Sequence, residues 1–382
     1  MIHAQLGRRV AYKEASCRPP VFQEAEETAI MRTKRFMINT GASVAACLAA
    51  TLGFAGPASA DGDDAGTNGP DIVEVLNGVA ASSTDPAVQV LEDVAQVPVD
   101  SSGGVLIAAD VEDVDVEVPV DPVDGIDLAD ETHDVSISLP FAAQADEGAE
   151  VANGVVAYDN NNGSITVPTV KDDGTIQVAT IIEGPDAPTS YSYELDLGGY
   201  ARPAVLDNGG ILFMDSSGSF VLGVAPPWAL DANGASVPTH YELTNGRVTQ
   251  VVEHRTSQVA YPVVADPILG IDLFSKTKRT NSSKGSTVSA TLSWLGQALV
   301  RSLTAAPILP GVAGTGLSLM VGAGWSELAK KQPAVATTAM YNQYVCHVTY
   351  GWTLKLSDTW DLESWRKSAT NPVTWVNTKC NW

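Results

Sequence analysis

Apolar and polar side chains alternate in short runs through the middle of the chain, which is the period of a strand with one buried face. Turns built from Asn or Asp followed by Gly separate these runs. Alternating runs between such turns predict antiparallel β-structure, in a sandwich or an open barrel. The clearest runs lie at 135–139, 176–182, 191–197 and 248–252.

Apolar residues three and four positions apart predict helices near both ends of this β segment. One short helix is expected within 71–95, and another follows from the spacing of leucines over 295–303. Thr337 or Thr338 is expected to cap a helix over 340–347. The uncharged stretch 302–326 is long enough for a membrane span, but its prolines and glycines favour a buried helical hairpin.

The front of the chain has the pattern of an export signal rather than of a fold. Residues 1–30 lack an apolar core and are interpreted as a mis-assigned start, with Met31 as the initiator. Residues 31–60 are the expected signal peptide, cleaved after Ala60, so that the protein is secreted and extracellular. Lipid attachment at Cys47 is the alternative, although an apolar run follows this cysteine where a lipoprotein has a polar tether.

Two cysteines, Cys346 and Cys380, remain after the expected cleavage. An even number of cysteines in an oxidising compartment predicts a disulfide between them. The bond would close a loop of about 35 residues and stabilise the fold by roughly 3–4 kcal/mol in the chain-entropy description.

The net charge of −23 is unevenly distributed along the 382 residues. Residues 61–150 hold 23 acidic and no basic residues, whereas residues 271–382 have a net charge of +6. This acidity argues against nucleic acid as a partner. Mutually repelling acids without aromatic residues predict that 61–130 is largely disordered. Because this polyanion is tethered to a basic region, one hypothesis is that it masks the C-terminal region, and the alternative is that the acids only keep the protein soluble and extended.

The β segment resembles a module of secreted bacterial proteins that precedes variable C-terminal domains. The resemblance rests on Ala-Pro-Pro-Trp-Ala-Leu-Asp-Ala-Asn-Gly at 225–234 and Tyr-Pro-Val-Val-Ala-Asp-Pro at 261–267. It implies a β-rich carrier or maturation module over 131–268 rather than an enzyme. A basic linker is expected to follow at 269–286.

Residues 287–382 resemble an uncharacterised bacterial domain of unknown function, and a small α+β, disulfide-closed domain is expected there. Four motifs carry the resemblance: Gly-Trp-Ser-Glu-Leu at 324–328, Gln-Tyr-Val-Cys-His at 343–347, Trp-Asp-Leu-Glu-Ser-Trp-Arg at 360–366, and the final Cys-Asn at 380–381. Lys367 departs from the pattern, because proline is expected after the arginine.

These motifs contain the candidate chemistry of the chain. A cleft with His347 as general base, Glu363 as its orienting or acidic partner and Arg366 as an anion-binding group would suit a hydrolase. The structural alternative is that tryptophans and the disulfide supply the core of a small domain, with Arg366 paired to an acid. A third alternative is that the tryptophans form a platform on which sugars stack. No spacing typical of a metal or cofactor site occurs, and we expect neither.

Two functional hypotheses follow. The first is a non-catalytic effector or interaction protein, whose cationic C-terminal domain binds an anionic envelope polymer or an extracellular protein. Its binding residues would be Trp360, Trp365, Arg366 and Lys367. The second is a secreted hydrolase that uses His347 and Glu363. No stable membrane span is expected in either case.

The export interpretation predicts that the mature protein begins at Asp61. N-terminal sequencing of protein recovered from the culture medium is expected to read Asp-Gly-Asp-Asp. A lipid-modified N-terminus at Cys47 would show that this interpretation is wrong.

Overall fold

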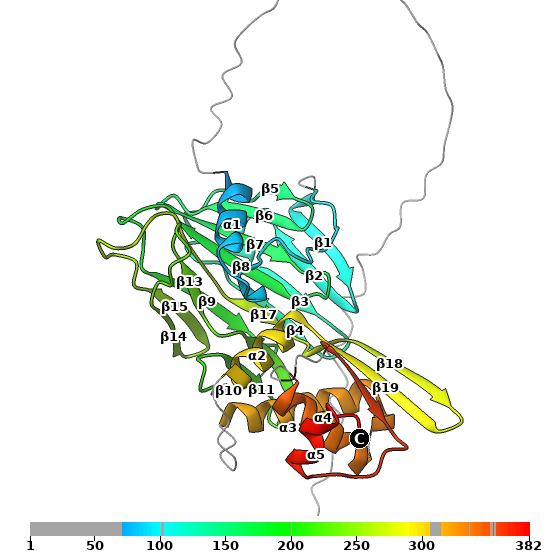
Figure 1. Ribbon diagram of the computed structural model, residues 1–382. Coiled ribbons are helices and arrows are strands. Elements are labelled where there is room, and N and C mark those ends of the chain that lie inside the picture. The colour runs from blue at the N-terminus through cyan, green and yellow to red at the C-terminus, as the bar shows by residue number, and fades with distance from the viewer. Residues whose placement is uncertain are drawn as a thin grey trace, which may run out of the picture. The chain divides into compact units, whose positions relative to one another are not determined.

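The computed structural model of the chain is shown in Figure 1. It describes residues 71–100, 103–199, 201–305, 315–335, 337–351, 354 and 357–382. The expected signal peptide, its cleavage site and Cys47 lie outside the described residues. All the described residues belong to one compact unit.

Two large antiparallel sheets form most of the structure (Figure 1). The first has the order β1-β2-β3-β4-β9-β15-β14. Its strands are β1 (Val105–Val111), β2 (Val114–Pro119), β3 (Ile126–Ala129), β4 (Asp134–Ile137), β9 (Ser190–Asp196), β14 (Thr239–Thr244) and β15 (Arg247–Val252).

The second large sheet has the order β10-β11-β12-β17-β8-β7-β6-β5. Outside this order, β16 pairs with β8 and also with β13. Its strands are β5 (Ala149–Ala152), β6 (Val155–Asp159), β7 (Ser164–Val170), β8 (Ile176–Ile182), β10 (Arg202–Val205), β11 (Ile211–Met214), β12 (Phe220–Val224), β13 (Trp228–Leu230), β16 (Val263–Asp266) and β17 (Ile268–Gly270).

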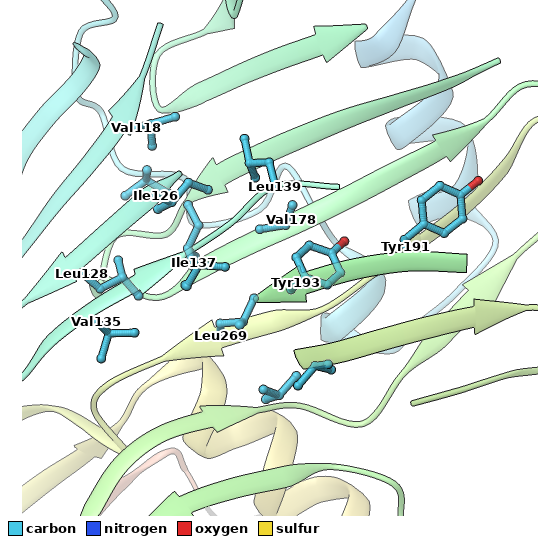
Figure 2. Packing of buried hydrophobic residues seen from close by; sticks show 14 of the residues in the cluster. Val118, Ile126, Leu128, Val135, Ile137, Leu139, Val178, Tyr191, Tyr193 and Leu269 are labelled. Carbon is cyan, nitrogen blue, oxygen red and sulfur yellow. The ribbon is translucent and has the colours of Figure 1, made fainter. Parts of the chain in front are cut away.

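The two sheets share one apolar core, as a sandwich does. Figure 2 shows part of this core, where Ile126 and Tyr193 from the first sheet lie with Val178 and Leu269 from the second. The expected antiparallel β architecture is therefore confirmed. It arises because alternate residues point to the same face of each strand.

Strands β7 and β8 are buried along their whole length, because both of their faces are covered. One face belongs to the sandwich core, and helix α1 (Ile72–Ala81) packs on the other through Leu76 and Val79. Asp71 caps this helix, since its carboxylate accepts the N–H groups of residues 73 and 74. Two short 3-10 helices lie in the same part of the chain, η1 (Pro86–Val88) and η3 (Pro122–Asp124).

The expected disorder of residues 61–130 is wrong from residue 71 onward. The valines of β2 are buried while its acids face outward, as the pattern of Val114, Val116 and Val118 against Asp115 and Glu117 shows. Exposed acids in water repel one another too weakly to outweigh the burial of a continuous row of valines. Strands β1–β3 consequently extend the β-rich part of the chain upstream of residue 131.

The expected linker at 269–286 is also wrong, because these residues form strands. Strand β18 (Phe274–Ser282) pairs with β19 (Gly285–Leu292), and β19 pairs with β20 (Thr359–Glu363) to give a third, small sheet. Polar residues occupy both faces of β18 beyond its buried Phe274, and this hid the strand period in the sequence.

Helices α2 (Trp294–Ala305), α3 (Thr315–Lys331), α4 (Thr338–Tyr350) and α5 (Pro372–Asn377), with the turn η4 (Pro333–Val335), complete the C-terminal α+β region. Helices α2 and α3 contact each other, and Thr337, one of the two predicted caps, caps α4. Within the described part of the chain, no helix is both long and apolar enough to cross a membrane.

The C-terminal helices and the second large sheet share a core. Leu295 and Leu299 of α2 are fully buried in a cluster that also holds Leu212 and Ile268 of the sheet. The approach is close at Gly223, where a Cβ atom would lie 2.7 Å from a methyl carbon of Leu295. The C-terminal region is thus packed onto the sandwich over an apolar surface.

This shared core predicts that residues 290–382 will not fold when they are expressed alone. The fragment lacks β18 with its buried Phe274, and it exposes the face of α2 that carries Leu295. Urea titration followed by circular dichroism is expected to show no cooperative transition for 290–382, but a clear one for 71–382. A sharp transition in the short fragment would contradict the packing described here.

Candidate functional site

His347 lies inside the C-terminal region rather than in an open cleft. Its side chain is on α4 and is only 4% exposed, and its ring stacks on Trp360 with 5.3 Å between the ring centroids. Neither ring nitrogen has a hydrogen-bond partner. Burial lowers the pKa of His347 to about 4, so the imidazole is neutral near pH 7.

Glu363 and Arg366 lie together, but away from His347. Alternation along β20 turns Trp360 and Leu362 toward the core and Glu363 toward the opposite face. The Arg366 side chain donates from Nε to the Glu363 carboxylate and from Nη1 to the carbonyl of Trp382, at 2.6 Å. Of the three catalytic candidates, the structure therefore brings together Glu363 and Arg366, as the structural alternative predicted. It does not bring the candidate general base, His347, to its predicted partner Glu363.

The predicted binding residues differ in their access to solvent. Trp360 is wrong as a binding residue, because it is 2% exposed and contacts Phe274 and Tyr344 in the core. Trp365 is half-buried against Gly285 at the tip of the β18–β19 hairpin. Lys367 is exposed, so that it and Trp365 stay available to a ligand.

The predicted disulfide between Cys346 and Cys380 is present and joins α4 to the residues after α5. Trp375 packs against it and stacks on Trp382 with 6.5 Å between the ring centroids. The Trp375 indole N–H donates to the carbonyl of Ala369 at 2.9 Å. These tryptophans complete a small core around the disulfide, as the sequence led us to expect for a domain of this size.

The sequence did not predict the role of Glu327, although this is the first charge after a long uncharged stretch. Its buried carboxylate accepts the N–H groups of Leu273 and Phe274 at 2.9–3.0 Å, which fixes α3 to the start of β18. Burial and the nearby Asp272 carboxylate raise the pKa of Glu327 to about 8. Lys331 binds Asp272 at 2.8 Å beside it.

Glu327 lines a cleft of about 590 Å³ between α3 and the first large sheet. Across the cleft, His133 and Asp130 form a hydrogen-bonded pair at 3.0 Å, and the second ring nitrogen of His133 lies 3.1 Å from the carbonyl of Phe220. Each of these side chains has a partner within the protein. No cluster of His, Cys, Asp and Glu suited to a metal ion occurs among the residues that the structure describes.

The tip of the β18–β19 hairpin is an exposed cluster of basic residues in the C-terminal region. Every residue from 278 to 284 is exposed, and this segment holds Lys278, Arg279 and Lys284 without any acidic residue. Nearer the sandwich, Lys276 pairs with Glu112 at 2.9 Å. This ion pair is one contact of the kind that the masking hypothesis requires, but it leaves the tip uncovered.

Residues 290–382 match a family described as "Protein of unknown function (DUF2599)". The expected C-terminal domain of unknown function is therefore found, over nearly the residues predicted for it. No curated protein matches the chain. Because β18 precedes residue 290, the small sheet contains one strand from outside the family match.

The buried position of His347 predicts acid sensitivity. Its pKa is about 4 in the fold and about 6.5 when unfolded, so the unfolded chain binds more protons between these values. Stability is expected to fall as the pH drops from about 6.5 to about 4, by roughly 3 kcal/mol in total.

His347→Phe keeps an aromatic ring against Trp360 and removes this titration, so the acid unfolding midpoint is expected to move to lower pH. His240→Gln is the control, because His240 is exposed on β14. Urea unfolding measured between pH 4 and 7 tests the prediction. An unchanged pH dependence in His347→Phe would contradict it.

Proposed function

We propose that this chain is a secreted, non-catalytic interaction protein that binds an anionic envelope polymer through the tip of the β18–β19 hairpin. The observation that carries the proposal is the cationic segment 278–284, in which every residue is exposed. Charges of one sign that project from a sheet attract a polyanion over about one Debye length, near 8 Å at physiological salt.

The surroundings of the tip support a binding role. Trp365 packs against the backbone of Gly285, next to Lys284, and offers a partly open aromatic surface. Aromatic rings beside cations are typical of sites that bind a polymer with both apolar and charged parts.

The hydrolase hypothesis has less support from the geometry. A general base needs a hydrogen-bond path to its substrate, and His347 is buried with its ring against Trp360. His347→Phe also tests this alternative, because a hydrolase that used His347 would lose its activity while the variant remained folded.

The binding proposal is tested with full-length protein and three soluble polymers: poly-L-glutamate, polygalacturonate and uncharged dextran. Lys278→Ala with Lys284→Ala is expected to weaken binding to the two polyanions by about 2 kcal/mol, or about 30-fold, at low salt. Arg202→Ala with Lys330→Ala is the matched control, since it removes the same charge from exposed positions elsewhere.

Binding measured by biolayer interferometry is expected to weaken with added salt, and dextran is expected not to bind. Equal losses in the two double variants would show that net charge, and not the hairpin, determines the affinity. Failure of the native protein to bind either polyanion would refute the proposed function.

A further inference from the structure

The small sheet has one face that is open to solvent and entirely polar. The inner face of β19 and β20 is apolar and packs on the helices, through Val288, Ala290 and Leu362 among others. Residues directly opposite one another on paired strands share a face, so the register identifies the residues of the open face. They are Lys276, Lys278 and Thr280 on β18, Thr287, Ser289 and Thr291 on β19, and Thr359, Asp361 and Glu363 on β20.

We propose that this open face, named here the polar ribbon, binds an anionic polysaccharide, with the anionic groups along β18 and the sugar hydroxyls along β19 and β20. The proposal rests on the proposed function and specifies its ligand. Solvent exposure alone explains why these nine positions are polar, but it does not explain their segregation by strand.

The edge formed by β18 supplies donors to anions. The ammonium groups of Lys276 and Lys278 can only donate hydrogen bonds, and both side chains are exposed. Two residues apart on one strand, they recur about 7 Å along the edge. Lys276 is engaged by Glu112, which leaves Lys278 and the tip residue Lys284 for a ligand.

The opposite edge supplies acceptors. The Asp361 carboxylate is exposed and accepts a hydrogen bond from Ser289 at 2.5 Å, so its second oxygen is left for a ligand. A carboxylate accepts hydrogen bonds but cannot donate them, and it would repel an anionic group. Sugar hydroxyls donate, and they therefore suit this edge.

On the open face, the central strand β19 carries only side chains with hydroxyl groups. Thr287 and Ser289 lie between the two charged edges, and Thr291 shares a hydrogen bond with Thr359 at 2.9 Å. Hydroxyls both donate and accept, so this row can pair with the ring substituents of a sugar in either sense. Across the polar ribbon, β18 carries donors, β19 carries hydroxyls and β20 carries acceptors. This order complements a polysaccharide that has carboxylates along one side and hydroxyls along the other.

The test compares two polymers of equal carboxylate number on the full-length protein. Polygalacturonate has hydroxyls beside its carboxylates, whereas poly-L-glutamate has none. Native protein is expected to bind polygalacturonate at least about fivefold more tightly, the equivalent of one net hydrogen bond. Thr287→Val keeps a β-branched side chain and is expected to remove that preference without weakening binding to poly-L-glutamate.

The charged edge is tested by a matched pair on one strand. Lys278→Gln is expected to weaken binding to both polymers by about fivefold. Arg279→Gln makes the same charge change at an exposed tip residue whose side chain is on the opposite face, opposite Val288. It removes only the long-range attraction that this tip charge contributes, and is therefore expected to weaken both affinities by no more than about twofold. Thermal unfolding of each variant confirms that the fold is retained.

Three outcomes would overturn the proposal, and they differ in meaning. Equal affinity of the native protein for the two polymers would remove the sugar specificity and leave the proposed function standing. An effect of Arg279→Gln as large as that of Lys278→Gln would remove the assignment to this face. Absence of binding to both polymers would end the proposed function as well.

Discussion

The arrangement of the whole C-terminal region depends on how the first turn of α2 is held against the sandwich. The backbone N–H of Trp294 donates to the Asp173 carboxylate at 2.5 Å, and the Lys171 ammonium lies 4.3 Å from the centre of the Trp294 ring. The Asp173 carboxylate and the Lys171 ammonium both belong to the turn between β7 and β8. Because this turn fixes the start of α2, Leu295 is directed to Gly223 and the remaining helices pack behind it.

The same lysine also joins the acidic front of the chain to the sandwich. Its ammonium donates to the carbonyls of Gln89, Val90 and Glu92 at 2.7–3.1 Å. Burial lowers the pKa of Lys171 to about 8, against the attraction of Asp266 and Asp173, and the side chain remains mostly charged at neutral pH. A buried charge is tolerated only where it is fully hydrogen-bonded, and three carbonyls meet that need.

The residues of the four motifs singled out in the C-terminal sequence are mostly inside the fold. Trp360 and His347 form part of a buried aromatic cluster, Glu327 binds the backbone of β18, and the disulfide closes a small core. The exposed polar ribbon, in contrast, is formed partly by β18, which precedes the family match. Motif residues therefore explain much of the stability of this region, whereas the cationic edge of the surface available to a partner lies on β18, which no motif identified.

The sequence by itself determined the antiparallel β architecture, a threonine cap for α4 at Thr337 or Thr338 and the pairing of Cys346 with Cys380. Each of these depends on local period, local hydrogen bonding or an even cysteine count. Only the tertiary structure decided that the acidic front joins the sheet, that β18 is a strand and that His347 is separated from Glu363. Those outcomes depend on contacts between residues far apart in the chain, and the composition of a single segment carries no information about what will cover it.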